Sequence, residues 1–307
     1  MGDRMSLGQK IIVTMGAFVI TFMTICMIFR QDISFLLVSK KIEREYGTIE
    51  ANSYFIEDYF EYTDNYEFAE VHSKKEIIDS IYYLINSGVS SAKRYCAKDY
   101  KNCYSDIDDI SNDANLLSVL NNYVHPFNSF DSIIFNFDEN VIEIEIKHTY
   151  TKEDIDVLNS RVDAFISQNI TNNMSTRDKI KVIHDYIINN TKYDSTNKTG
   201  ASDIPSSTAY GVLKDNIGIC SGYADVMSLF LDKLNIKNYR ISSDSHVWNL
   251  VYIEGAWKHL DVTWDDPVTS DGSDMLSDKY FLIDNNTLLN NSSNEHIYNK
   301  EIYIEAQ

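Results

Sequence analysis

The stretch that decides the fold is Asp215-Asn216-Ile217-Gly218-Ile219-Cys220-Ser221-Gly222-Tyr223-Ala224-Asp225, which runs into an apolar segment ending near Leu234. Apolar residues recur after Cys220 at the spacing of one helix face, which predicts a helix that starts at the cysteine. Gly218 and Gly222 allow a sharp turn and the close approach of another segment. A cysteine in the first turn of a helix faces unpaired N–H groups and the positive end of the helix dipole, which favour the nucleophilic thiolate. An isolated cysteine is more often buried and inert, so the role of Cys220 depends on its surroundings.

Composition excludes several classes of protein. The 307 residues are enough for about two ordinary domains. A net charge of −19 argues against a nucleic-acid surface and against docking on anionic lipid. Four cysteines are too few for a disulfide scaffold, and no cysteine or histidine pair has zinc-finger spacing, so neither a structural metal nor a cofactor is expected. Cys96 and Cys103 are close enough in sequence for a local bridge, and two free thiols are the alternative.

The N-terminal residues 1–38 are predicted to be a membrane anchor. Residues 11–29 form an uncharged apolar run between Lys10 and Arg30, long enough to span a bilayer. No small-residue cleavage site follows, which favours an uncleaved anchor over a signal peptide. Positive charges flank both sides, but long acidic domains translocate regardless of charge. We therefore expect a single-pass protein of the cell membrane whose remaining residues are extracytoplasmic.

Residues 39–150 are predicted to be a mixed α/β region of unknown role. Helices are expected over residues 76–86 and 114–124, and strands over 132–136 and 141–148 as a hairpin with one wet face. Between the helices we expect an acidic loop. Its carboxylates are better explained by solvation than by calcium binding (Asp106, Asp108 and Asp109).

Residues 151–307 are predicted to form a second domain. Two helices, capped by Thr151 and Ser175, are expected over residues 151–170 and 175–189. A long polar loop is expected over residues 192–210, followed by the cysteine helix over 220–234. Two strands, 247–253 and 257–264, are expected around a turn at Glu254-Gly255. An acidic loop over 265–274, a short strand over 280–283 and a polar tail complete the domain.

The two strands after the cysteine helix suggest a base and an orienting acid for Cys220. Thiol catalysis needs both groups. A two-residue turn at Glu254-Gly255 places His246 opposite Thr263, so Asp261 lies diagonally on the same face, with Cβ atoms roughly 7 Å or less apart. A three-residue turn would put His246 and Asp261 on opposite faces. His259 shares the face of Asp261, so this geometry leaves it as an alternative base.

Other residues near this hairpin are candidates for supporting roles. Trp248 and Trp264 would exclude water from the histidine–aspartate pair, or would simply pack in the core. The backbone N–H of Cys220 is a natural donor to an oxyanion, and the Tyr210 hydroxyl is a second candidate donor.

Four runs in this order resemble the transglutaminase-like superfamily: Tyr210-Gly211-Val212-Leu213, Gly218-Ile219-Cys220-Ser221-Gly222-Tyr223-Ala224, His246-Val247-Trp248-Asn249 and Trp257-Lys258-His259-Leu260-Asp261-Val262-Thr263-Trp264-Asp265. The resemblance covers about residues 175–283. It implies an α+β, papain-like core in which the helix that carries the nucleophile packs on an antiparallel sheet. It also implies that Cys220 is the nucleophile, His246 the base and Asp261 the orienting acid, and it favours His246 over His259.

The resemblance implies acyl transfer at peptide or glutamine amide bonds, with cross-linking, deamidation or proteolysis as the outcome. Protein or peptide substrates are expected, cell-wall peptides among them. The calcium sites of animal transglutaminases have no recognisable counterpart, since the acidic loop lacks calcium-loop spacing (Asp265, Asp266, Asp271 and Asp274). The alternative is a non-catalytic binding or structural module of the cell surface with the same fold. The presence of all three site residues favours an enzyme.

Overall fold

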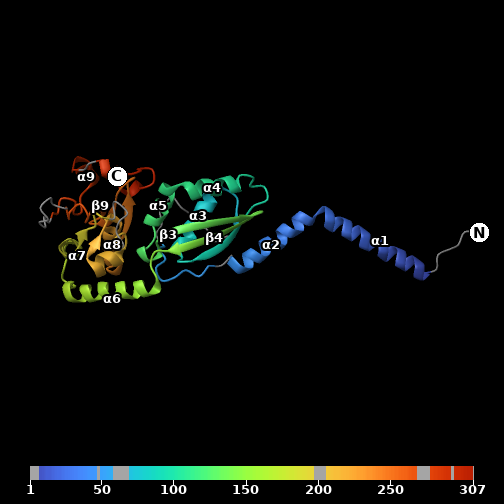
Figure 1. Cartoon of the computed structure of the whole chain (residues 1–307), viewed down its shortest axis with the longest axis horizontal. Coiled ribbons are helices and arrows are strands. Elements are labelled where there is room, and N and C mark those ends of the chain that lie inside the picture. Colours follow the sequence, from blue (N-terminus) through green and yellow to red (C-terminus); the bar gives the residue numbers. More distant parts are fainter. Residues whose placement is uncertain are drawn as a thin grey trace, which may run out of the picture.

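The body of the molecule contains a four-stranded sheet, a three-stranded sheet and the two-stranded sheet β5-β6 in its described residues, and helices α1 and α2 extend away from it toward the N-terminus (Figure 1). The computed structural model describes residues 7–46, 49–57, 69–196, 205–267, 277–291 and 294–306. Helix α1 spans Leu7–Ile28, and α2 spans Arg30–Tyr46. Among the helices in these described ranges, none combines the length and the apolar character needed to cross a bilayer. The transmembrane helix expected over residues 11–29 is therefore not supported.

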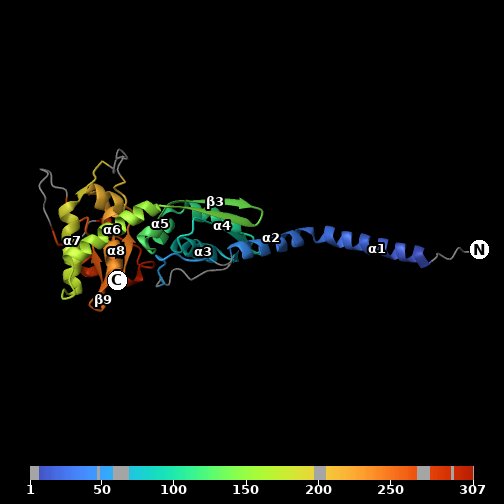
Figure 2. The same ribbon diagram turned by 90° about the horizontal axis from the view of Figure 1, so that it is seen from below.

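The sheet of the first half has four strands in the order β1-β2-β4-β3. Strand β1 is parallel to β2, and the other neighbours are antiparallel. The hairpin predicted from residues 132–136 and 141–148 is confirmed as β3 and β4, and Glu139 in its turn has a φ of 51°. Figure 2 shows α3, α4 and α5 together on one side of β3. The elements are β1 (Glu70–Val71), α3 (Lys74–Asn86), β2 (Ser91–Cys96), α4 (Cys103–Asn112), α5 (Ala114–Asn122), η1 (Pro126–Asn128), β3 (Phe130–Asp138) and β4 (Val141–His148).

Helix α4 replaces the acidic loop that the sequence predicted, so that prediction was wrong. Cys103, Ile107 and Ile110 lie three or four residues apart, and all three are buried on one face of the helix. The acidic residues lie between these anchors. Asp106 accepts a hydrogen bond from the Tyr100 hydroxyl at 2.5 Å. A disulfide bond joins Cys96 to Cys103 and ties the end of β2 to the start of α4.

The sheet of the second half has three antiparallel strands in the order β7-β8-β9, and α8 packs against β7 and β8. The elements are α6 (Lys152–Asn169), α7 (Thr176–Asn190), β5 (Lys192–Tyr193), η3 (Gly211–Asp215), β6 (Ile217–Gly218), α8 (Cys220–Lys233), β7 (Asn238–Ser242), β8 (Val247–Ile253), β9 (Ala256–Leu260), α9 (Asn285–Asn291), η4 (Asn294–His296) and η5 (Ile304–Ala306). The mixed α/β content and the cysteine helix on an antiparallel sheet agree with the expected core.

The local signals for helices α6 and α7 are confirmed. Thr151 and Asp154 form a reciprocal capping box, and Ser175 caps α7 by accepting from the backbone N–H of Asp178.

The C-terminal predictions need correction. Strand β9 ends at Leu260, because the chain turns at residues 262–265. The strand expected over residues 280–283 is reduced to a single bridge between Ile283 and His259. The expected polar tail contains α9, η4 and η5, whose residues Leu288, His296 and Ala306 are buried.

The two halves share one apolar core across residue 150. Residues of the first sheet and its helices pack in the same cluster as Trp248, Leu250 and Tyr303. Arg240 on β7 forms a buried ion pair with Asp225 on α8, and both residues belong to the second half. Arg240 also donates to the backbone carbonyl of Val124 and to the hydroxyl of Ser129, both of which belong to the first half (3.0 Å each).

Candidate active site

Cys220 is the first residue of α8, as the sequence predicted. The preceding Ile219 is extended, with φ −109° and ψ 178°, and provides no side-chain cap. The first backbone N–H groups of α8 are therefore available to a ligand. Cys220 is a free, half-buried cysteine.

Glycines shape the turn around Cys220 as expected. A Cβ atom on Gly222 would lie 2.5 Å from the carbonyl oxygen of Ser206, and one on Gly218 would lie 2.5 Å from Cγ2 of Val212. Ser206 also accepts the backbone N–H of Ile219 at 2.8 Å. The segment around Ser206 thus lies directly against the start of the cysteine helix, which any side chain larger than hydrogen would disturb.

The β8–β9 hairpin has the register that the sequence predicted. Its turn consists of Glu254 and Gly255, with φ values of 56° and 78°, so it is a two-residue turn with both central residues left-handed. Asn249 pairs with Leu260 at the open end of the hairpin, where His246 directly precedes β8 and Asp261 directly follows β9. Nε2 of His246 lies 2.6 Å from Oδ2 of Asp261. Both side chains are buried.

Cys220 lies close enough to His246 to affect its ionisation, since it is one of the groups that raise the pKa of His246, after Asp261. Nε2 of His246 is occupied by Asp261. The structure therefore brings Cys220, His246 and Asp261 into one region.

Electrostatics favour the charged forms of this pair. Burial alone would lower the pKa of His246, but the charge and hydrogen bond of Asp261, together with Cys220, raise the pKa to about 10. Burial would raise the pKa of Asp261, but the charge and hydrogen bond of His246 and the hydrogen bond of His296 hold it well below its ordinary value. A buried imidazolium–carboxylate pair is thus the stable state near neutral pH.

His259, the alternative base in the sequence, has no ring nitrogen left for this chemistry. Its Nδ1 accepts the indole N–H of Trp248 at 3.0 Å, and its Nε2 lies 3.2 Å from the carbonyl oxygen of Ala306. Burial is the main reason that the pKa of His259 falls to about 4. His259 is therefore a neutral core residue at physiological pH.

Two indole rings border the pair. Trp248 stacks on His246, with ring centroids 5.6 Å apart and an interplanar angle of 14°, and Trp264 lies 6.2 Å away. Trp248 is also among the largest fully buried side chains of the core. It therefore packs in the core and also shields the imidazole from water.

A third histidine contacts Asp261, and the sequence analysis missed it. Nε2 of His296 lies 2.7 Å from Oδ2 of Asp261. His296 belongs to η4, in the segment predicted to be a polar tail. No periodic pattern or turn motif marks it in the sequence, and only its identity as a histidine could have drawn attention to it.

The tyrosine expected near the thiol is a different one. The Tyr210 hydroxyl accepts a hydrogen bond from Lys214. Tyr193 on β5 lies near Cys220 instead. Burial is the first cause that raises the pKa of Tyr193 to about 12, and the charge of Cys220 is the second.

The acidic residues after Asp261 are engaged within the protein. Asp265 is buried beside His184, with Oδ2 3.1 Å from Nε2, and Asp266 accepts the Tyr223 hydroxyl at 2.6 Å. Asp271 and Asp274 lie outside the described residues.

Within the described ranges, His246, Asp261 and His296 offer ligand atoms within 4.8 Å of one another, which is close enough to surround a cation. Hydrogen bonds from Nε2 of each histidine to Oδ2 of Asp261, at 2.6 and 2.7 Å, also explain why these groups lie so close together.

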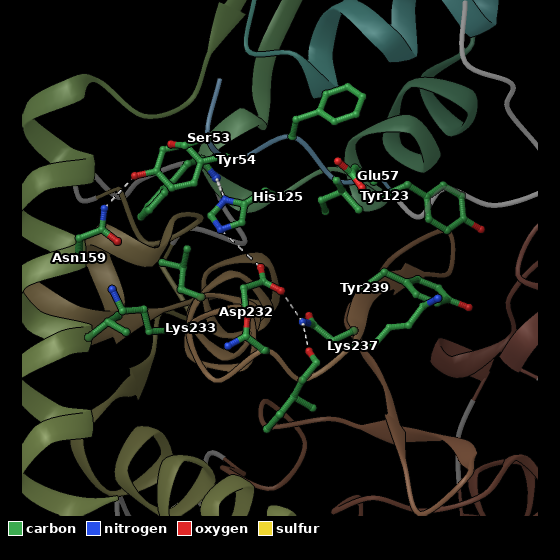
Figure 3. A pocket seen from close by; sticks show the side chains of 18 of the residues that line it. Ser53, Tyr54, Glu57, Tyr123, His125, Asn159, Asp232, Lys233, Lys237 and Tyr239 are labelled. Atoms are coloured by element: carbon green, nitrogen blue, oxygen red, sulfur yellow. Dashed lines mark hydrogen bonds and ion pairs between the residues drawn. The ribbon is translucent and has the colours of Figure 1, made fainter. Parts of the chain in front are cut away.

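A pocket of about 940 Å³ opens at the far end of α8 (Figure 3). In the figure, the His125 ring points toward Asp232, and Tyr54 and Lys233 flank them. Asp232 is twelve residues after Cys220, so the pocket is roughly 18 Å from the thiol along the helix. Cys220, His246 and Asp261 are not among the described residues that line this pocket.

Comparison with known proteins gives a family match that includes Cys220, His246 and Asp261. Residues 164–262 match the model of the Transglutaminase-like superfamily. The chain carries a transglutaminase-like domain. None of the curated proteins matches the chain.

The transglutaminase-like domain also has similar solved structures. One is described as a TGase (18% identity, 50% of this chain and 47% of that chain, TM-score 0.32). Another is a candidate cysteine protease from Cytophaga hutchinsonii (14% identity, 48% of this chain and 65% of that chain, TM-score 0.28). A third is menin, described with its binding site for Mixed Lineage Leukemia protein (17% identity, 43% of this chain and 29% of that chain, TM-score 0.29). The aligned part spans less than half of the first of these structures.

Proposed function

We propose that this protein is a cysteine enzyme that transfers acyl groups through a thioester on Cys220. The observation that carries the proposal is the position of His246, whose Nε2 lies 2.6 Å from Asp261 and whose pKa is raised in part by the nearby Cys220. In thiol acyl transfer a base in this position accepts the proton of the thiol and later gives a proton to the leaving group. In this proposal Cys220 is the nucleophile, His246 the general acid and base, and Asp261 the residue that orients His246.

The proposed reaction has two halves. The Cys220 thiolate attacks an amide carbonyl, a C–S bond forms, the C–N bond breaks, and the leaving nitrogen takes a proton from the His246 imidazolium. Water or an amine then gives a proton to His246 and attacks the thioester, which forms a C–O or C–N bond and returns the thiolate. The carbonyl oxygen becomes negative in both halves, and the uncapped N–H of Cys220 at the start of α8 is placed to stabilise it.

The proposed substrates are proteins or peptides, with glutamine side chains or peptide bonds as acyl donors and cell-wall peptides as one class. Transfer to an amine would cross-link two chains, and transfer to water would be deamidation or proteolysis. No nucleic acid is expected as a partner, because the net charge is −19.

The proposed location is the outer side of the cell membrane. A disulfide bond such as Cys96–Cys103 is typical of proteins in oxidising compartments. Attachment through residues 11–29 is a hypothesis that rests on their uncharged sequence and on exposed apolar side chains of α1, Phe18 and Met27 among them.

The deciding experiment treats the purified full chain with a thiol alkylator and, separately, with a labelled amine and a glutamine-containing protein. Cys26→Ala is the matched control for Cys220→Ala, since Cys26 is the other free, half-buried cysteine in the described residues. We expect Cys220 to be alkylated faster than Cys26 at neutral pH. Amine incorporation that is lost only in Cys220→Ala would identify a transglutaminase, and peptide cleavage or ammonia release without incorporation would identify a hydrolase. Equal alkylation of both cysteines, with no product, would identify the non-catalytic module instead.

A further inference from the structure

The carboxylate of Asp261 is shared by two imidazoles. Oδ2 receives Nε2 of His246 at 2.6 Å and Nε2 of His296 at 2.7 Å, while Oδ1 accepts the backbone N–H of Trp264 at 3.0 Å. An ionised carboxylate can only accept hydrogen bonds, so Nε2 of His296 carries a proton and donates. Asp261 is therefore held by three donors that come from three separate segments.

The His296 ring is fixed by its neighbours as well as by this hydrogen bond. It stacks on Tyr280, with centroids 5.2 Å apart and an interplanar angle of 17°, and it contacts Trp264 and Trp248 edge-on at 4.8 and 4.9 Å. The side chain is fully buried. The ring therefore cannot leave Asp261 without disturbing the aromatic side chains that surround the site.

The second nitrogen of His296 makes packing alone a poor explanation for this residue. Nδ1 is buried and has no hydrogen-bond partner among the described residues. A buried polar atom without a partner is unfavourable, and an apolar ring of similar size would fill the same space without that penalty. What a phenylalanine could not supply is the N–H that contacts Asp261.

The segment that carries His296 is also tied to the base. Tyr298, two residues later, forms a β-bridge with Ser243. Ser243 in turn donates its backbone N–H to the carbonyl oxygen of His246 at 2.9 Å and accepts the His246 N–H on its hydroxyl at 3.1 Å. This C-terminal segment, which lies outside the matched residues 164–262, thus contacts both the acid and the base of the site.

We propose that His296 is a positioning residue for acyl transfer: its Nε2–H holds the Asp261 carboxylate in the orientation that turns His246 toward Cys220. The proposal rests on the function proposed above for Cys220. Without this donor the carboxylate can rotate, and His246 then loses its alignment with the sulfur. A misalignment of about 1 Å lowers turnover on the order of 10²-fold.

Other charged and titratable groups around Asp261 have to stay constant in a test. The charge of Asp261 affects the pKa values of His259 and Tyr280. Cys220 belongs to the same group, because Cys220 and Asp261 both affect the pKa of His246. Asp265 faces Tyr280 from the following turn. Substitutions at position 296 leave all of these groups in the chain.

The test compares His296→Phe, which keeps a ring and removes the donor, with His296→Gln, whose side-chain amide keeps an N–H. His125→Phe is the matched control, because it removes another imidazole beside a carboxylate, a half-buried one 3.5 Å from Asp232 at the far end of α8. We measure kcat, KM and the pH profile of Cys220 alkylation in the full chain, after confirming cooperative thermal unfolding of each variant. We expect His296→Phe to lose kcat on the order of 10²-fold at a nearly unchanged KM and to alter the pH profile, whereas His296→Gln and His125→Phe keep both close to wild type.

A folded His296→Phe variant with wild-type kcat and a wild-type pH profile would overturn the proposal. If His296→Phe does not fold, His296→Gln is compared with His296→Asn, whose shorter amide does not reach Asp261, and equal pH profiles for these two would overturn it as well. Failure of the proposed function would look different, because wild-type Cys220 would then be alkylated no faster than Cys26.

Discussion

Trp248 donates its indole N–H to Nδ1 of His259 at 3.0 Å, while the face of the same indole stacks on His246. This contact separates the two histidines that the hairpin places near Asp261. His259 is held neutral in the core, and His246 is left to pair with the carboxylate and the thiol. One tryptophan thus occupies a ring nitrogen of His259 and leaves His246 as the histidine that the proposed function needs as its base.

Asp261→Asn tests the orienting acid. The amide keeps the size of the side chain but removes its charge, so His246 loses the main interaction that raises its pKa. We expect acyl transfer to fall roughly 10³–10⁴-fold, as in other triads that lose this charge. The raised pKa of His246 means that the imidazolium is present at low pH and is lost as the pH rises through about 10. In the variant, His246 should lose its proton at a pH closer to neutral, and the pH profile of Cys220 alkylation should show this shift. A profile that is unchanged at basic pH would contradict the proposed role of Asp261.

His259→Gln tests whether the buried neutral histidine limits stability in acid. The pKa of His259 is lowered from 6.5 to about 4, so the unfolded chain binds a proton that the folded chain does not bind between these values. The stability that depends on neutral His259 is therefore complete above pH 6.5 and decreases as the pH falls toward 4. We expect the variant to take up about one proton fewer on unfolding near pH 5. The dependence of the urea midpoint on pH measures this number, and an identical slope in both proteins would refute it.

Arg240→Met tests the buried ion pair with Asp225 and the hydrogen bonds by which Arg240 reaches the first half. The substitution leaves the buried carboxylate of Asp225 without its cation, although the Tyr150 hydroxyl still donates to it at 2.6 Å. Breaking a buried pair on one side lowers the free energy of unfolding by about 3–5 kcal/mol. Chemical denaturation should show this loss. The double variant with Asp225→Leu should recover part of it, because no uncompensated charge then remains.

Gly222→Ala tests the close approach next to the nucleophile. The added Cβ would lie 2.5 Å from the carbonyl oxygen of Ser206, so the helix start or the facing segment has to shift. We expect a loss of about 1–3 kcal/mol in stability and slower alkylation of Cys220, since overpacking displaces the backbone. Gly255→Asn is the control, because that glycine has open space around its Cα and asparagine tolerates the left-handed conformation. Equal effects of the two variants on alkylation would contradict this account.

Local sequence signals predicted much of the candidate site. The helix that begins at Cys220 follows from its apolar spacing and the small residues before it, and the register of His246 and Asp261 follows from the Glu254-Gly255 turn. These features depend on residues that are close in sequence, where capping and turn chemistry act directly.

What the sequence did not reveal depends on distant contacts. Helix α4 has only three buried anchors among acidic residues, so its periodicity was too weak to distinguish it from a loop. His296 contacts Asp261 across 35 residues and lies in a polar segment without periodicity. Its ring is placed by tertiary packing against Tyr280 and Trp264, which no local pattern specifies.

The stacking of Trp248 on His246 also provides the protein with an intrinsic optical probe. A cationic imidazole parallel to an indole interacts with its π-electrons, whereas a neutral imidazole does so only weakly. Fluorescence emission from this tryptophan should therefore change when its neighbour gains or loses a proton. The ionisation of the histidine could then be followed in the unlabelled protein, before any substrate is known.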